Sequence, residues 1–240
     1  MPLCWASARP VGRSLDHQPR GHVASRQLSR QAGHLRRPSL MSVIALTLRE
    51  AQAGPVRACW ARLEARLGLW GVQRTLFPHV TLLGCDGLDR PSLQAVLEDF
   101  SHRLAPFSLR TAGLGVFLRP KPVLHAPVIR TPALSRLHLR LWEEVGRLGG
   151  DRYDLYSPER WLPHLSLAVG DLTPDNLLEA LAILADMDQE LRFEVTNLTL
   201  FEWIGPCWEP LERYPLLGTD TPERAPAESE TPALGAGRRP

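Results

Sequence analysis

The chain has few cysteines and no long apolar run. Only four of its 240 residues are cysteine, and no two of them have the Cys-x-x-Cys spacing of a metal-binding or redox pair. Such sparse cysteines are typical of reduced, unpaired thiols in a cytoplasmic protein. No segment approaches the roughly 18–20 apolar residues that a membrane-spanning helix needs. We therefore expect a cytoplasmic protein with no membrane partner, and neither a disulfide scaffold nor a cysteine-based zinc site.

The chain also lacks a large net charge. The formal net charge is +2, which is too low for a nucleic-acid coat protein. Hydrophobic residues make up 44% and charged residues 22% of the chain, as in ordinary soluble globular proteins. Lys121 is the single lysine, so arginines dominate the basic residues. An anion-binding site in this chain would be built largely from arginine, whose planar guanidinium suits bidentate phosphate contacts.

Both ends of the chain lack the apolar periodicity of folded elements. Residues 1–40 carry seven arginines against one acidic residue, Asp16. We interpret them as a disordered basic extension upstream of a natural start at Met41, with a basic arm that adds non-specific RNA affinity as the alternative. From Gly218 onward Pro, Glu, Ala, Ser and Gly dominate, which is typical of a disordered tail. We expect one folded domain over residues 41–217 and a tail over 218–240.

Between these ends, strand and helix patterns alternate. The expected strands are 43–48, 79–83, 107–118, 123–129, 165–169, 191–203 and 208–214. The expected helices are 55–67, 90–104, 132–148 and 174–187. Short, hairpin-like links between the strands favour an α+β fold over a doubly wound parallel sheet.

One short pattern occurs twice. Residues 78–82 read Pro-His-Val-Thr-Leu, and residues 163–167 read Pro-His-Leu-Ser-Leu. Because side chains alternate between the two faces of a strand, the histidine and the hydroxyl of each copy share one face. The aliphatic residues point to the other face and can anchor the strand in the core. Both copies are predicted to lie on strands that each follow one helix and precede another.

Two His-x-hydroxyl pairs suit acid–base chemistry on a phosphodiester. If the two halves oppose each other, His79 and His164 flank one phosphorus, where one deprotonates water and the other protonates the leaving oxygen. The unperturbed histidine pKa of ~6.5 lets both protonation states exist near neutral pH. Thr81 and Ser166 would bind the non-bridging oxygens. This chemistry requires no metal and no other cofactor. Structural coincidence and a two-histidine metal site are the alternatives, and the latter lacks a third ligand at the usual spacing.

The two motifs resemble the signature of the 2H phosphoesterase superfamily, in particular 2′-5′ RNA ligase-like proteins and RNA 2′,3′-cyclic phosphodiesterases. The resemblance covers residues 41–215 and includes the lead-in 156–163 to the second motif. It implies a bilobed α+β fold, in which two pseudo-symmetric halves with antiparallel sheets form a central cleft and the helices lie outside. It also implies metal-independent hydrolysis of 2′,3′-cyclic phosphates to 2′-phosphates, or reversible 2′-5′ joining of RNA ends. By this resemblance His79 is the acid and His164 the base.

Several RNA-processing members of this superfamily carry a basic residue soon after each motif, and this chain does not. Phosphate contacts would have to come from elsewhere. Arg119 and Lys121, in a proline-punctuated turn, and Arg130, after the next strand, are candidates to line the cleft mouth; a solvated turn is the alternative. Tyr156 and Trp161 are candidates to stack on a nucleobase, with core packing as the alternative for each.

Three functions remain open from the sequence. The first is a cyclic phosphodiesterase, most simply one acting on an RNA end. The second is the same chemistry on a small nucleotide, such as a cyclic phosphate of ADP-ribose or a 2′-5′ oligonucleotide. The third is a non-catalytic protein that binds nucleotides or RNA, against which the two intact His-x-hydroxyl pairs argue. Nothing in the sequence indicates an obligate oligomer, so we expect a monomer.

Overall fold

The computed structural model of the protein describes residues 41–187, 190–204 and 207–220. The expected extension 1–40 lies outside the described residues, as does the chain from residue 221 onward. The described part continues three residues past 217, where Asp220 and Ala105 are joined by a backbone hydrogen bond of 3.1 Å. No helix in the described part is both long and apolar enough to cross a bilayer.

Most of the strands form one open, antiparallel sheet. Its order is β10-β9-β1-β2-β7-β5-β4, and β6 pairs with β2 beside this path. Two further strands, β3 and β8, form a separate antiparallel pair. The bounds are β1 Ser42–Thr47, β2 His79–Asp86, β3 Phe107–Arg110, β4 Gly115–Phe117, β5 Val123–Pro127, β6 Asp151–Arg152, β7 His164–Ala168, β8 Arg192–Val195, β9 Asn197–Ile204 and β10 Cys207–Pro215.

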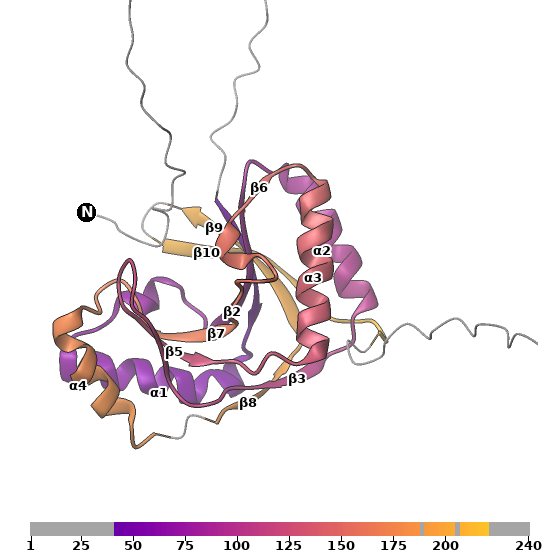
Figure 1. The fold of residues 1–240 in the computed structure, drawn as a ribbon. Coiled ribbons are helices and arrows are strands. Elements are labelled where there is room, and N and C mark those ends of the chain that lie inside the picture. The colour runs from indigo at the N-terminus through magenta and orange to yellow at the C-terminus, as the bar shows by residue number, and fades with distance from the viewer. Residues whose placement is uncertain (1–40, 188–189, 205–206, 221–240) are drawn as a thin grey trace, which may run out of the picture. The chain divides into compact units, whose positions relative to one another are not determined.

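The four helices of the described part pack as two pairs (Figure 1). Helix α1 (Glu50–Leu67) lies against α4 (Pro174–Leu184) and β7, and α2 (Arg90–Arg103) lies against α3 (Pro132–Arg147), β9 and β10. The last three helices each begin at a capping residue, with a proline one or two positions later. The side chains of Asp89, Thr131 and Thr173 accept hydrogen bonds from backbone N–H groups of the first turn, as expected of N-caps.

The order strand–helix–strand–helix–strand occurs twice along the chain. The first copy is β1-α1-β2-α2-β3 and the second is β5-α3-β7-α4-β8, if β6 is left aside. The matching strands β2 and β7 pair with each other, as do β3 and β8. These pairings confirm the expected α+β class with antiparallel sheets. The two helix pairs do not correspond to the two halves of the sequence, however. Each pair contains one helix from each copy.

Two of the expected strands are each divided into two. The chain over 107–118 breaks at Gly113, which has a φ of 65° that glycine adopts readily, so β3 joins the small sheet and β4 the main one. The chain over 191–203 divides at Thr196, between β8 and β9. Helix α1 begins at Glu50 and not at residue 55, so Pro55 lies inside it. Periodicity alone did not reveal these breaks, because the apolar alternation runs through them.

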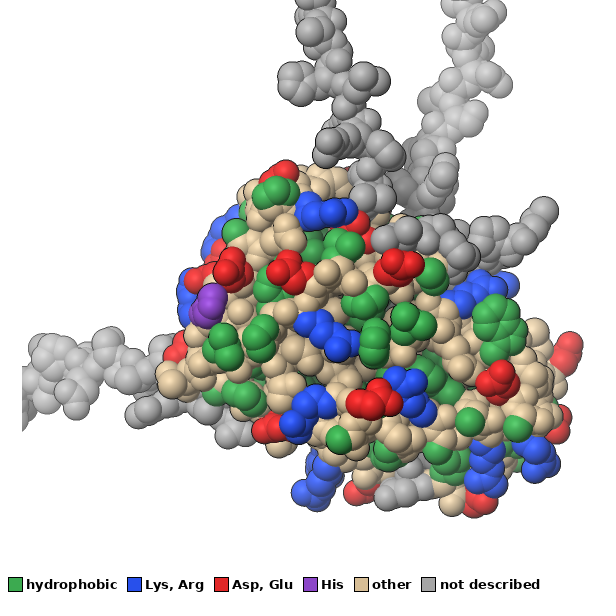
Figure 2. All heavy atoms as spheres, turned by 180° about the vertical axis from the view of Figure 1, so that it is seen from behind, with side chains coloured by type: hydrophobic (Ala, Val, Ile, Leu, Met, Phe, Trp, Pro, Cys, Tyr) green, Lys and Arg blue, Asp and Glu red, His purple; other side chains and the backbone are tan. Residues whose placement is uncertain are grey.

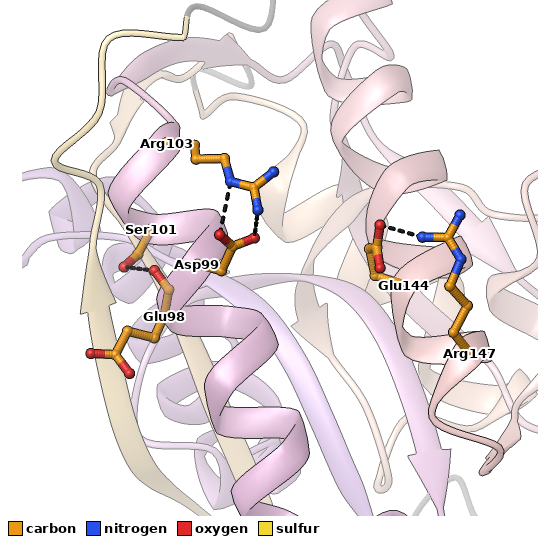
Figure 3. A network of polar contacts seen from close by, with 6 residues as sticks. All are labelled: Glu98, Asp99, Ser101, Arg103, Glu144 and Arg147. Carbon is orange, nitrogen blue, oxygen red and sulfur yellow. Dashed lines mark hydrogen bonds and ion pairs between the residues drawn. The ribbon is translucent and has the colours of Figure 1, made fainter.

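The core lies between the main sheet and the two helix pairs. Val80, Leu82, Leu165 and Leu167 on the motif strands are at most 1% exposed and belong to it. The view from behind shows basic and acidic side chains interspersed with apolar ones (Figure 2). That face of the described part therefore presents no broad patch of one charge. Exposed ion pairs, such as Asp99–Arg103 on α2 and Glu144–Arg147 on α3, join residues about one turn apart along each helix (Figure 3).

Candidate functional site

The two motif strands meet at the centre of the main sheet. Val80 of β2 is the Cα partner of Leu165 of β7, in an antiparallel pair. The register around that single pair sets His79 opposite Ser166, and Thr81 opposite His164. A local twofold relation therefore runs through the Val80–Leu165 pair, and it brings the two motifs together.

All four polar side chains lie on the face of the sheet that is turned away from the helical core, here called the site face. His79, Thr81, His164 and Ser166 are partly exposed, whereas the residues between them are fully buried. The two histidines are diagonal neighbours, which places their Cβ atoms ~7 Å apart or a little less. The motifs therefore lie on adjacent strands of one sheet, and not on two opposed surfaces.

Each motif histidine is held in the same way. Nδ1 of His79 lies 2.9 Å from the carbonyl oxygen of Phe77, and Nδ1 of His164 lies 2.7 Å from that of Leu162. Because a carbonyl oxygen only accepts, Nδ1 must carry the proton in both rings. In both histidines Nε2 is therefore the nitrogen that is available to take up or release a proton.

Burial changes the acid–base state of both rings. It lowers the pKa of His79, and it is the main cause that lowers the pKa of His164 to about 4. Positive charge on His125 or His79 lowers the pKa of His164 further. Both motif histidines are therefore neutral near pH 7 in the free protein. A bound phosphate would favour the protonated form of whichever ring it contacts.

Strands β2 and β7 diverge on both sides of the Val80–Leu165 pair, and two buried indoles bind strand carbonyl groups there. The indole N–H of Trp161 donates to the carbonyl oxygen of Thr81 at 2.9 Å, and that of Trp60 on α1 donates to the carbonyl oxygen of Ser166 at 3.0 Å. Trp161 is 1% exposed, so it has no face to offer to a nucleobase. The expectation that Trp161 stacks on the substrate is thus corrected: it supports the backbone of the first motif.

Tyr156 lies beside the first motif. Its side chain is 6% exposed and its hydroxyl is hydrogen-bonded to the side chain of Thr81. Burial raises the pKa of this phenol, so it stays protonated at neutral pH. The expected stacking on a base is corrected here too, since the ring is in the core and its hydroxyl orients Thr81.

The three basic residues predicted to bind phosphate lie in two separate parts of the structure. The guanidinium of Arg130 donates to the carbonyl oxygen of Pro158 at 2.9 Å and lies over the ring of Trp161, so it clamps the lead-in to β7. Arg119 and Lys121, at the tip of the β4–β5 hairpin, line a hollow of about 470 Å³ whose other wall includes Gly170 and the start of α4. Of the three, the hairpin residues are the ones that face open space.

The structure adds a residue that sequence reasoning missed. His125 of β5 is the Cα partner of Ser166 and is 6% exposed, and its ring centroid lies 5.0 Å from that of His164. Phe117 of β4 is in contact with both rings. No local motif surrounds His125, so only the pairing of β5 with β7 could have revealed it. Across the described ranges, no three His, Cys, Asp or Glu side chains are grouped so that they could hold a metal ion.

Several solved structures are similar to this chain. Among solved structures, TT0787 of Thermus thermophilus matches 75% of this chain and 100% of its own, with a TM-score of 0.51 and 19% identity. Apo LigT of E. coli matches with a TM-score of 0.47 and 16% identity over 75% of this chain and 98% of its own. Usb1 of Kluyveromyces marxianus matches with a TM-score of 0.41 and 10% identity over 73% and 98%.

At such identities structural likeness shows the fold alone, and no curated protein sequence matches the chain. A family model described as the 2′-5′ RNA ligase superfamily, however, matches residues 50–206. That match covers more than half of the chain and includes both motifs. The chain therefore belongs to the 2′-5′ RNA ligase superfamily of 2H phosphoesterases.

Proposed function

We propose that the protein is a metal-independent phosphodiesterase that hydrolyses 2′,3′-cyclic phosphates, at RNA ends or in nucleotides, to 2′-phosphates. The observation that carries the proposal is the pairing of β2 with β7, which sets two His-x-hydroxyl pairs around one point on the site face. Membership of a superfamily of phosphoesterases supports the reaction class. The fixed Nδ1–H of each histidine supports the use of Nε2 in proton transfer.

The hydrolysis needs one base and one acid. His164 takes a proton from water as the water oxygen bonds to phosphorus, and His79 gives a proton to O3′ as the P–O3′ bond breaks. The product is a 2′-phosphate with a free 3′-hydroxyl, and the two histidines have exchanged protonation states. Burial that keeps His164 neutral suits it to the role of base. The negative charge of the substrate stabilises the protonated His79 that the step requires.

Thr81 and Ser166 supply the remaining polar contacts. Their hydroxyl groups lie on the same face as the histidines and can donate to the two non-bridging oxygens, whose charge grows in the transition state. Neither hydroxyl depends on a flexible loop, because each lies within a strand. The hydroxyl of Tyr156, hydrogen-bonded to the side chain of Thr81, supports this geometry.

The same site can join RNA ends. If the 5′-hydroxyl of a second RNA replaces water as the nucleophile, breaking the P–O3′ bond yields a 2′-5′ phosphodiester. Proton transfers at His79 and His164 are then unchanged. Arg119 and Lys121, which line the hollow at the tip of the β4–β5 hairpin, are the candidates to contact a further phosphate of such an RNA.

One assay tests the proposal. The purified protein, in EDTA, is offered 2′,3′-cyclic nucleotides, RNA with a cyclic-phosphate end, the cyclic phosphate of ADP-ribose, and 2′-5′ oligoadenylate. We expect turnover of cyclic phosphates to 2′-phosphates. Turnover of none of these compounds would contradict the proposal and favour the binding protein. Turnover of the ADP-ribose or oligoadenylate compound alone would replace the RNA substrate with a small nucleotide.

We further propose that the enzyme acts as a monomer in the cytoplasm. Cys59 and Cys85 are free and buried, and burial raises the pKa of both thiols, which keeps them protonated and unreactive. Light scattering coupled to gel filtration should give the mass of one chain. A mass of two chains at micromolar concentration would contradict the monomer.

A further inference from the structure

The local twofold relation between β2 and β7 does not extend to the residues beside Thr81 and Ser166 on the flanking strands. On the side of β1, the Cα partner of Thr81 is Ala45. At the matching position on β5, the Cα partner of Ser166 is His125. A methyl group therefore lies beside the first motif where an imidazole lies beside the second.

His125 is held from three directions. Its Nδ1 lies 3.3 Å from the carbonyl oxygen of Val123, two residues earlier, as in both motif histidines. The ring of Phe117 stacks on it, with centroids 4.1 Å apart and planes 18° apart. A Cβ atom at Gly115 would lie 2.5 Å from Nε2 of His125, so glycine is needed for the ring to lie there. These restraints leave His125 one orientation.

His125 and Phe117 together form a wall beside His164. The His164 centroid lies 5.0 Å from each of their centroids, with planes inclined by 60° and 78°. With Nδ1 of His164 bound to the carbonyl oxygen of Leu162, rotation of this ring is limited. His79 has a different neighbour, the ring of Phe201 at 5.5 Å.

We infer that His125 is a positioning residue that makes His164 the base of the pair, because it holds that ring and opposes a positive charge on it. The ring centroids of His125 and His164 are 5.0 Å apart, so positive charges on both rings would repel each other. A charge on one ring therefore disfavours a charge on the other. The inference rests on the proposed function for the identity of the reaction.

The groups around His164 agree with this role. Burial is the main cause of its lowered pKa, and the charges that lower it further come from His125 on β5 and His79 on β2. Phe117 on β4 has no charge. Burial also lowers the pKa of His125, so that ring carries a charge, and opposes one on His164, only at acid pH. A neutral His164 is able to accept the proton of water.

Titration of His164 by NMR in the free protein tests the electrostatic part without a substrate. His125→Phe keeps a ring against Phe117 and removes the charge, whereas His125→Ala removes both. We expect the pKa of His164 to rise by at least ~0.5 unit in both variants. It should stay unchanged in His102→Ala, whose histidine is exposed on α2. An unchanged His164 titration in both folded His125 variants would overturn the inference.

Kinetics on a 2′,3′-cyclic nucleotide test the positioning part. We expect His125→Ala to lower kcat about tenfold with KM changed less than about twofold, and His125→Phe to recover most of kcat. The acid limb of the pH profile should move to higher pH in both. A raised KM with unchanged kcat would show that His125 binds substrate, and would overturn the inference. If the unmodified protein turns over no cyclic phosphate, the proposed function fails, while the NMR titration still decides whether His125 sets the charge of His164.

Discussion

At the scale of single residues, His79 and His164 act as one unit around one phosphorus. We expect His79→Ala and His164→Ala each to lower kcat by at least ~10², because each removes a proton transfer. The double variant should lose little more than either single variant, since one transfer has little value without the other. Steady-state kinetics on a cyclic nucleotide measure this. His102→Ala is the control, and activity that survives both changes would contradict the mechanism.

Tyr156 provides a second test at this scale. Tyr156→Phe removes the hydroxyl that binds Thr81 and leaves the packed ring in place. We expect kcat to fall several-fold, by about 1 kcal/mol in transition-state stabilisation, because one hydrogen bond that orients Thr81 is lost. Tyr214→Phe is the matched control, because it removes a hydroxyl bonded to Glu212 on β10, away from the site. Equal activity of Tyr156→Phe and the unmodified protein would contradict the role.

The sequence predicts some of these residues and not others for a physical reason. Strand alternation requires only neighbouring residues, so it places His79 with Thr81, and His164 with Ser166, on shared faces. His125 joins them only through the register of β5 with β7, which no local pattern records. The burial of Trp161 could not be predicted locally either. It depends on the separation of β2 from β7, two strands that are distant in the sequence.

At the scale of elements, the single contact pair of β2 with β7 depends on the two indoles beside it. Trp60→Phe and Trp161→Phe should each lower the free energy of unfolding by about 1–3 kcal/mol, because each leaves a buried carbonyl without its donor. Urea denaturation measures the change. The matched control is Trp70→Phe, whose ring is 51% exposed, and it should change stability by less than about 0.5 kcal/mol. Equal stability of all three variants would show that the indole N–H groups are dispensable.

Helices and strands differ in how well the sequence predicted them. Three of the four helices in the described part begin at a capping residue with a proline one or two positions later, a signal contained within four residues. The strand breaks at Gly113 and Thr196 depend instead on which partner strand each segment finds. Likewise β6 is two residues long and exists only as a partner of β2.

At the scale of the whole molecule, the repeated topology explains why the site is at the centre. Matching strands of the two copies pair with each other, so the motifs they carry must meet. Helix α1 of the first copy packs against the motif strand β7 of the second copy. The second copy therefore does not bury its motif strand alone in this arrangement. We infer that folding and site assembly are one event.

Stability against pH follows from the histidines that this packing buries. His138 on α3 is 1% exposed and stacks on Trp161, with ring centroids 3.8 Å apart. Burial, and after it the charge of Arg130, lowers its pKa to about 4, against ~6.5 in the unfolded chain. Between these values the unfolded chain binds more protons than the folded one, so the free energy of unfolding must fall as pH drops. The contribution is fully present above pH ~6.5.

The size of this effect can be measured. A shift of about 2.5 units corresponds to about 3 kcal/mol, so His138 alone should account for up to that loss between about pH 6.5 and 4. Urea denaturation at several pH values gives the curve. His138→Phe keeps a ring on Trp161 and cannot be protonated, so its stability should fall less steeply with acid. His102→Phe should keep the slope of the unmodified protein, because that histidine is exposed in the folded state. If His138→Phe and the unmodified protein lost stability equally, the charge on His138 would not drive acid unfolding.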